Sequence, residues 1–293
     1  MVSTIIVIPA RGGSVEVPRK NLRLLNGKPL ILYTILAAKG TSFKKDIFVS
    51  SDDNEILNLS EYYQCKTLKR SKALSDHKTT LDEVIYDTFL KAEAIENKKY
   101  QHIITLQPTS PLIKSKDINL AFKKLCDSKS DTVISVSREN HLFWKVNKKK
   151  LEPLFKKRVN RQFLDPLYKE NGAIILCNRK QILKKTRIGS KIEFYKLENE
   201  SNIDIDNNLD FKICESILQR KRIIIDISNN KIVNFSNLIN FLIIAYSINF
   251  HCIKFLCLEN DIFAAKLFKR KKFNVEILKG KSIKNLITSY QPH

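Results

Sequence analysis

Apolar and polar positions alternate with two different periods along the first two thirds of the chain. Short apolar runs rich in β-branched residues are typical of buried parallel strands, and the stretches between them carry apolar residues at helical spacing. The predicted strands are 4–8, 46–50, 102–106, 131–136, 173–177 and 192–197, and the predicted helices are 29–39, 80–95, 117–126 and 210–222. Strands that alternate with helices predict βαβ units, and therefore an α/β fold around a mostly parallel sheet.

The pattern changes near residue 219 and predicts a second, smaller unit. A first domain over 1–219 is followed by a small α/β appendage over 220–293, with strands at 222–227, 252–258 and 274–278 and helices at 235–250 and 261–271. The apolar stretch 239–258 raises the alternative of a membrane span. It contains Asn240, His251 and Lys254, which are costly in a bilayer, so no membrane association is expected.

Composition and charge narrow the class of protein. The chain has 293 residues, and 43% of them are hydrophobic, enough for a packed core. The net charge of +22 comes from lysines spread along the whole chain. A global compositional bias produces such a charge, so a nucleic-acid-binding protein remains a remote alternative. The basic residues could form solvated faces or attract an anionic small substrate. Six cysteines without a CxxC pair exclude a disulfide framework and a zinc ribbon, and residues 2–9 lack the flanks of a signal peptide, which predicts a cytoplasmic protein.

A glycine pair follows the first predicted strand directly. Residues 9–14 read Pro-Ala-Arg-Gly-Gly-Ser, and residues 18–21 read Pro-Arg-Lys-Asn. Glycines let the backbone approach a phosphate closely, and arginine adds a forked donor suited to phosphate oxygens. The alternative is an ordinary turn with solvated cations, because the pair matches neither the Walker pattern nor GxGxxG.

This loop is the first of several motifs that follow one another along the chain. They are residues 8–14 with 18–30, Ser75-Asp76 with Thr79-Thr80, residues 106–112 (Leu-Gln-Pro-Thr-Ser-Pro-Leu), Arg161-Gln162 with residues 170–174 (Glu-Asn-Gly-Ala-Ile), and residues 203–206 (Ile-Asp-Ile-Asp). Over about residues 1–218 the chain thereby resembles the acylneuraminate cytidylyltransferases, which are the CMP-sialic acid synthetases and their legionaminate and pseudaminate relatives. The resemblance implies a Rossmann-like sheet of the nucleotide-diphospho-sugar transferase type.

The resemblance also implies a reaction and a set of contacts. The anomeric hydroxyl of a nine-carbon α-keto acid sugar attacks the α-phosphorus of CTP, and pyrophosphate leaves. Such transfer depends on positioning and charge neutralisation. The implied nucleotide contacts are Arg11, Gly12, Gly13, Ser14, Lys20, Asn21, Arg70, Thr79 and Thr80, the sugar contacts are Gln107, Arg161 and Asn171, and the catalytic residues are Arg11, Lys20 and Asp206.

Simpler roles remain open for three of these residues. Thr80 opens a capping-box pattern with Glu83, so a helix cap alone could explain it. Gln107 could be a polar strand end that satisfies nearby backbone groups. Arg161 could be one more member of the basic cluster formed by Lys145, Lys148, Lys149, Lys150, Lys156, Lys157 and Arg158.

Two aspartates form a candidate metal site. Asp204 and Asp206 are two residues apart, so on an extended segment both side chains point to one face. Two carboxylates there could hold Mg²⁺ against phosphate oxygens, as the resemblance implies. The alternative is that the pair caps the helix that follows.

The phosphate loop departs from the family pattern. Val15-Glu16 stands where relatives carry Lys-Gly, and Ile113 stands where a basic residue is usual. A carboxylate near a triphosphate repels it. A catalytically weakened relative that acts as a binding or assembly partner is therefore the alternative to a working enzyme.

The resemblance also implies an oligomeric state, and a fainter resemblance covers the start of the appendage at 220–293. Family members are commonly homodimers, and residues 142–168 are the expected dimer arm. Residues 225–232 resemble the start of the UDP-sugar hydrolases of pseudaminate synthesis. Residues 233–236 lack the glycines and histidine of those enzymes, which indicates a truncated, non-catalytic remnant.

Overall fold

The computed structural model describes residues 3–14, 16–76, 78–198 and 200–218, and the backbone of three strands further along the chain. The chain divides into two compact units, Met1–Ile217 and Leu218–His293. Each unit is described by itself.

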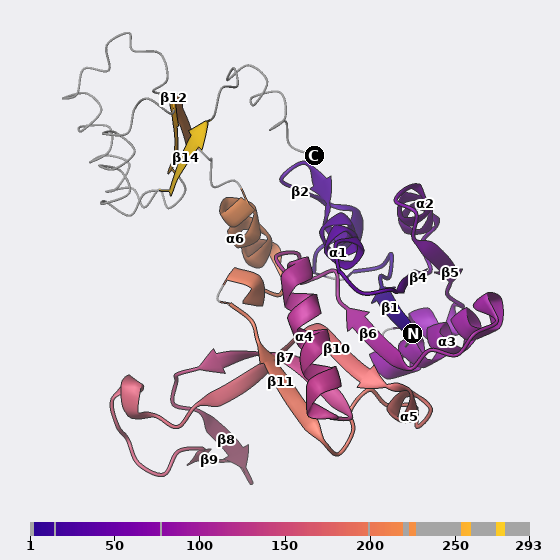
Figure 1. Ribbon diagram of the computed structural model, residues 1–293. Coiled ribbons are helices and arrows are strands. Elements are labelled where there is room, and N and C mark those ends of the chain that lie inside the picture. The colour runs from indigo at the N-terminus through magenta and orange to yellow at the C-terminus, as the bar shows by residue number, and fades with distance from the viewer. Residues whose placement is uncertain are drawn as a thin grey trace. The chain divides into compact units, whose positions relative to one another are not determined.

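The first unit is built on a seven-stranded sheet in the order β11-β7-β10-β6-β1-β4-β5 (Figure 1). These strands are β1 (Thr4–Pro9), β4 (Asp46–Ser51), β5 (Lys66–Lys69), β6 (His102–Leu106), β7 (Thr132–Glu139), β10 (Leu167–Asn178) and β11 (Ile192–Lys196). Neighbouring strands are parallel except that β10 runs antiparallel to both β6 and β7. The predicted α/β class and mostly parallel sheet are confirmed.

Helices cover both faces of this sheet. They are α1 (Leu30–Lys39), α2 (Asn54–Tyr62), α3 (Leu81–Glu96), α4 (Ser115–Ser128), α5 (Arg179–Ile182) and α6 (Asn208–Leu218). Alternate residues of β1 enter opposite layers, since Ile6 and Ile8 pack with α1 and α4 while Ile5 and Val7 pack with α3 and α5. The central strand is thus buried on both faces, as its continuous apolar run predicts.

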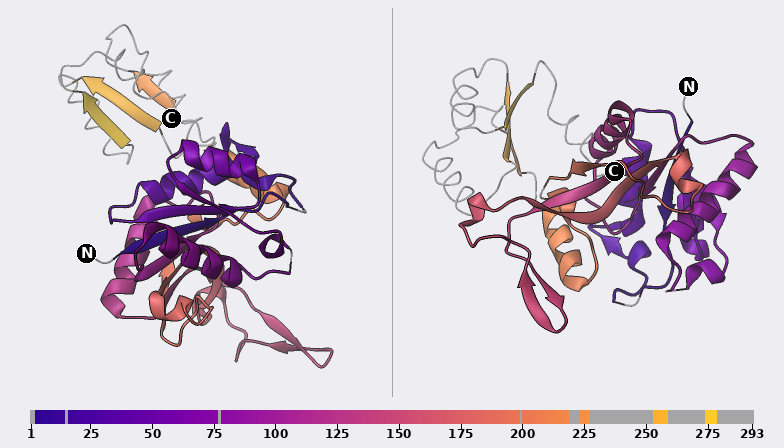
Figure 2. Two further views of the ribbon diagram at one scale, coloured as in Figure 1. Left: turned by 90° about the vertical axis from the view of Figure 1, so that its right-hand side faces the viewer. Right: turned by 90° about the horizontal axis from the view of Figure 1, so that it is seen from below.

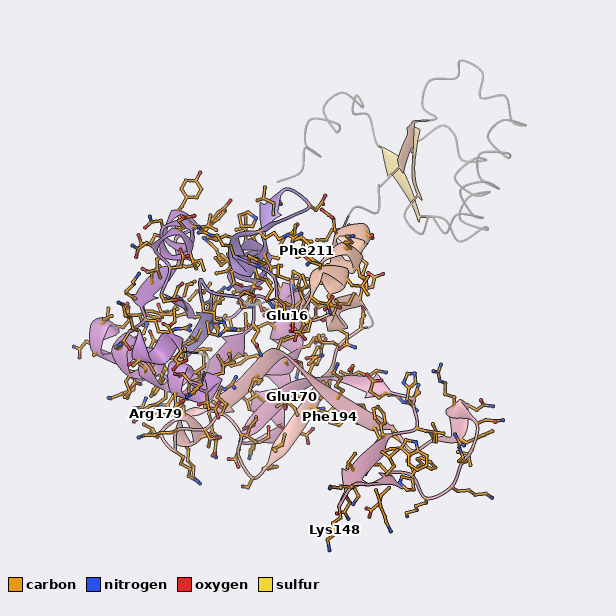
Figure 3. All side chains as sticks on the ribbon, turned by 180° about the vertical axis from the view of Figure 1, so that it is seen from behind. Glu16, Lys148, Glu170, Arg179, Phe194 and Phe211 are labelled. Atoms are coloured by element: carbon orange, nitrogen blue, oxygen red, sulfur yellow. The ribbon has the colours of Figure 1, made fainter. Side chains whose placement is uncertain are left out.

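Two small hairpins accompany the sheet. The first joins β2 (Leu24–Leu25) to β3 (Lys28–Pro29), and the second joins β8 (Trp144–Asn147) to β9 (Lys150–Pro153). The β8–β9 ribbon projects away from the sheet, with Lys148 at its end (Figures 2 and 3). Lys148 and Lys149 both have positive φ, 45° and 66°, which is the backbone of a type I′ hairpin turn.

The second unit contains a three-stranded parallel sheet in the order β12-β13-β14. Its strands are β12 (Ile223–Asp226), β13 (Ile253–Leu258) and β14 (Asn274–Leu278), close to the strands expected there. The helices expected at 235–250 and 261–271 lie outside the described residues, as does most of the apolar stretch 239–258. Among the residues that are described, the structure has no helix long and apolar enough to cross a membrane.

A buried ion pair ties α3 to α5. Arg179 donates from Nη2 to Glu93 Oε2 at 2.9 Å, and the Tyr100 amide donates to Glu93 Oε1 at 2.8 Å. Only 6% of the Glu93 side chain is exposed. Burial alone would raise the pKa of Glu93, but the bonds from Arg179 and Tyr100 outweigh it and lower the pKa below the usual 4.5.

We expect Glu93→Gln to reduce the free energy of unfolding by about 3 kcal/mol at pH 7, because Arg179 loses its counter-charge in a buried site. A lowered pKa stabilises the fold above pH 4.5, and that contribution disappears as the pH falls through the folded-state pKa. The stability difference between parent and variant should therefore shrink below pH 4.5 in urea titrations. Asp127→Asn, which removes an exposed charge paired with Lys123, is the control and should change stability by less than about 0.5 kcal/mol. A Glu93→Gln deficit of the same size at pH 7 and pH 3 would contradict the assignment.

Candidate active site

The loop after β1 is hydrogen-bonded to the end of β4 and to the segment that leads into α2. The Ala10 amide donates to Ser50 O and the Gly12 amide donates to Asp52 Oδ1, each at 2.9 Å. A Cβ on Gly12 would lie 2.7 Å from the Cβ of Asp53, whereas one on Gly13 would meet nothing within 4 Å. A side chain at position 12 would therefore clash with Asp53 at the start of α2, whereas position 13 faces open space.

A cavity of about 300 Å³, called here the smaller cavity, opens beside this loop. It lies at the carboxyl ends of β1 and β6, where ligands of open α/β sheets bind. Seven of the predicted nucleotide contacts line it: Arg11, Gly13, Ser14, Lys20, Asn21, Arg70 and Thr79. Ser75 and Asp76, which belong to the same resembling segment as Thr79, also line it.

Polar groups in the smaller cavity are partly pre-positioned. Asn21 is buried and donates from Nδ2 to Arg11 O at 2.9 Å, while its Oδ1 is buried without a hydrogen-bond partner. Arg70 is buried too and donates from Nη2 to Ser50 O at 2.8 Å. Three cations, Arg11, Lys20 and Arg70, therefore converge on one cavity, as an anionic ligand requires.

The remaining loop residues lie elsewhere. Glu16 is exposed and is not among the residues that line the smaller cavity, and Val15 lies outside the described residues. Arg19 has φ of 52° and pairs with Glu55 at 2.8 Å and with Asp53 at 3.5 Å. The carboxylate at position 16 is therefore held neither in the cavity nor by Arg19.

A second cavity of about 650 Å³, called here the larger cavity, adjoins the first, since Gln107 lines both. Asn171, Asp204 and Asp206 line it, as predicted for sugar and metal contacts. Its wall also contains residues that no sequence motif indicated: Ser137, Glu139, Lys169, Asn202, Asn207 and Asp210. A signal was available for Lys169, Asn202 and Asn207, because each adjoins one of the predicted site segments in the sequence.

A glycine turn shapes the junction of the two cavities. Gln107 donates from Nε2 to Gly172 O at 2.9 Å, and Gly172 has φ of 68° at an irregularity in the pairing of β10 with β7. The neighbouring Asn171 is buried, donates to Asn202 Oδ1 at 2.8 Å and accepts from Ser135 Oγ at 2.5 Å. These contacts hold the amides of Gln107 and Asn171 in place before any ligand is bound.

The two aspartates flank a buried isoleucine. Ile205 is fully buried, its amide donates to Thr109 O at 2.7 Å, and Lys20 Nζ donates to Ile205 O at 2.6 Å. Both carboxylates line the larger cavity. Asn207 Oδ1 accepts from the amides of Leu209 and Asp210 at the start of α6, so Asn207, rather than the aspartate pair, caps that helix.

The pair has the properties of a site for a hard cation. Asp204 Oδ1 is buried without a hydrogen-bond partner. The pKa of Asp204 is raised above its usual value, because burial disfavours the charged carboxylate and the nearby Asp206 adds a like charge. A hydrogen bond from the Thr109 hydroxyl opposes this shift. The described residues contain no group of three or more His, Cys, Asp and Glu that could hold a metal by itself. Mg²⁺ needs only one or two carboxylates when phosphates supply the other oxygens, so Asp204 and Asp206 fit it.

Three predicted residues line neither cavity: Gly12, Thr80 and Arg161. Thr80 caps α3, because its hydroxyl accepts from the Glu83 amide while the Glu83 carboxylate accepts from the Thr80 amide at 2.7 Å. Arg161 lies on the short helix that follows the β8–β9 ribbon, with Nη2 2.6 Å from His141 Nε2.

Comparison with known proteins bears directly on this site. The sequence model of the family described as Cytidylyltransferase matches residues 5–234. The chain belongs to the cytidylyltransferase family. It is 36% identical to the N-acylneuraminate cytidylyltransferase of Streptococcus agalactiae over 218 residues, which cover 71% of this chain and 51% of the relative. It is 30% identical to the CMP-N,N'-diacetyllegionaminic acid synthase of Legionella pneumophila over 232 residues, which cover 73% of this chain and 95% of the relative.

The family membership confirms the resemblance found in the ordered segments and identifies the chain as an enzyme of the cytidylyltransferase type. The chain spans about half the length of the streptococcal relative. A solved structure of CMP:2-keto-3-deoxy-manno-octonic acid synthetase complexed with CTP superimposes with a TM-score of 0.56. It covers 74% of this chain and 98% of its own and is 16% identical, so that likeness concerns the fold.

Proposed function

We propose that this cytidylyltransferase transfers CMP from CTP to the anomeric hydroxyl of a nonulosonic, sialic-acid-like sugar and releases pyrophosphate. The observation that carries the proposal is the pair of adjoining cavities that share Gln107. The smaller one gathers three cations, as a triphosphate requires, and the larger one has room and polar groups for a sugar acid. The names of the streptococcal and Legionella relatives support this substrate class.

In this mechanism the chain positions the reactants and neutralises charge. Arg11, Lys20 and Arg70 balance the triphosphate, and Gln107 and Asn171 orient the sugar in the larger cavity. A bond forms between the anomeric oxygen and the α-phosphorus, and the bond from that phosphorus to the α–β bridging oxygen breaks so that pyrophosphate leaves. The proton of the attacking hydroxyl passes to water. Mg²⁺, held by Asp204 and Asp206, would supply further charge neutralisation at the phosphates.

The same proposal includes a homodimer. The arm at 142–168 carries large apolar side chains in solvent, with Val146 73% exposed and Phe163 71% exposed. Arg161 lies in this arm and does not reach the cavity of its own chain. We propose that it reaches the sugar carboxylate in a second copy. We also propose that the enzyme works in the cytoplasm.

A pyrophosphate-release assay with CTP, Mg²⁺ and a panel of nonulosonic acids tests the function. We expect release that depends on one of the sugars and on CTP. CTP binding without release for any of these sugars would support the second candidate, a weakened relative that acts as a binding partner, which the Val15-Glu16 substitution favours.

Gly172→Ala should raise KM for the sugar about tenfold and leave KM for CTP nearly unchanged. An added Cβ would lie 2.5 Å from Gln107 Nε2 and displace that amide, and of the two cavities Gly172 itself lines only the larger one. Gly27→Ala is the matched control, because Gly27 has a similar φ of 79° in the β2–β3 turn and its Cβ would meet nothing within 4 Å. Alanine is therefore strained by a positive φ in both variants. Equal steady-state constants for the two variants would show that the Gln107 contact is irrelevant.

A further inference from the structure

Lys20 connects two parts of the site that are 185 residues apart in the sequence. Its side chain lines the smaller cavity, and its Nζ donates to Ile205 O at 2.6 Å. Ile205 stands between the two aspartates, and the positive charge of Lys20 acts on Asp204. One ammonium group therefore serves the nucleotide cavity and the aspartate pair.

The positive charge of Lys20 opposes the binding of a divalent cation and favours the binding of a nucleoside triphosphate. A cation beside the aspartate pair weakens the attraction of the pair for a second, divalent cation, since like charges repel strongly in a partly buried site. The neutral carbonyl of Ile205 is a weaker acceptor for an ammonium than a phosphate oxygen, because charge-assisted hydrogen bonds are the strong ones. The lysine stem is flexible enough to exchange one acceptor for the other.

We propose that Lys20 is an internal counter-ion that keeps the Asp204–Asp206 pair a weak site for divalent cations until a nucleoside triphosphate draws the ammonium away from Ile205 O. The inference rests on the proposed metal role of the pair. It makes the binding of triphosphate and of divalent cation mutually favourable, and the coupling is reciprocal by thermodynamic necessity. Lys20 therefore controls the affinity of the pair for the metal and also contacts the nucleotide.

A purely structural role for this bond predicts the opposite result on mutation. If Lys20 served only to hold residues 204–206 in place, its removal would make the two aspartates more mobile and weaken metal binding. The segment has other anchors, however. The Ile205 amide donates to Thr109 O, the Ile205 side chain is fully buried, and Asp210 accepts from the amides of Asp206 and Asn207 at 3.0 Å. These contacts keep the carboxylates in place without Lys20.

Mn²⁺ binding, followed by electron paramagnetic resonance on the full chain without nucleotide or sugar, tests the proposal. We expect Lys20→Met to bind Mn²⁺ at least about tenfold more tightly than the parent, although its affinity for CTP falls. Lys45→Met is the matched control, because Lys45 is also half-buried and donates from Nζ to Thr41 O at 2.8 Å, in the loop that precedes β4. It should bind Mn²⁺ as the parent does. Adding Asp206→Ala to Lys20→Met should abolish the gain.

Two outcomes would overturn the proposal, and they differ in what else they affect. If Lys20→Met binds Mn²⁺ equally or less tightly while Asp206→Ala weakens Mn²⁺ binding in the presence of CTP, the counter-ion role is wrong and the metal role stands. If Asp206→Ala leaves Mn²⁺ binding unchanged in the presence of CTP, the metal role of the pair is wrong, and the counter-ion role falls with it.

Discussion

Asp206→Ala is expected to lower kcat for pyrophosphate release by about a thousandfold, which corresponds to about 4 kcal/mol of the activation barrier. Asp206 lines the larger cavity beside Asp204, and the two carboxylates are the proposed ligands of Mg²⁺. Losing one of them removes charge stabilisation where the triphosphate reacts. The remaining activity should depend only weakly on Mg²⁺ concentration, as rates measured over a range of Mg²⁺ would show.

This variant should fold like the parent. The Asp206 side chain is exposed, and the cap of α6 is supplied by Asn207, so thermal unfolding should be little changed. Asp127→Ala, an exposed carboxylate on α4, is the control for a general loss of negative charge and should retain parental kinetics. Unchanged rate and unchanged metal dependence in Asp206→Ala would remove both aspartates from the site.

The double change Val15→Lys, Glu16→Gly is expected to raise kcat/KM for CTP by about ten- to a thousandfold, or about 1.4–4 kcal/mol. A lysine in the phosphate loop would attract the triphosphate and the leaving pyrophosphate, and a carboxylate opposes both. Glu16 is exposed, so water screens its charge, and the lower part of this range is expected. Glycine at position 16 would also widen the choice of loop shapes.

Steady-state kinetics of the parent, the double variant and both single variants, at matched Mg²⁺ and salt, would test this prediction. Most of the gain should come from Val15→Lys, because Glu16 does not line the smaller cavity. A parent that is already fast, with no improvement in the double variant, would mean that Arg11, Lys20 and Arg70 compensate for the loop substitution.

Features that depend on local chemistry could be predicted from the amino-acid sequence alone. The continuous apolar run of β1 predicted a strand buried on both faces, and Thr80 with Glu83 predicted the cap that begins α3. The ordered segments predicted membership of the family. Each of these signals is contained in a few adjacent residues, so no tertiary contact was needed to recognise it.

Elements with weak local signals were missed. The edge strand β5 is largely polar, with the sequence Lys-Thr-Leu-Lys, and pairs with only one neighbour, so no apolar run marks it. The predicted strand at 173–177 belongs to the longer β10, which runs antiparallel to its neighbours. Strand direction follows from the path of the connecting chain, and the side-chain pattern of a strand does not encode it.

The assembly of the site depends on tertiary contacts that no motif encodes. The tertiary structure brings Lys20 against Ile205 across 185 residues, adds Lys169 and Glu139 to the wall of the larger cavity, and leaves Arg161 outside it. A motif specifies which side chains are available, but the distances between them depend on the register of strands and on the loops that join them. A lysine therefore looks the same in the sequence whether it is solvated, binds a phosphate or lies beside a pair of carboxylates.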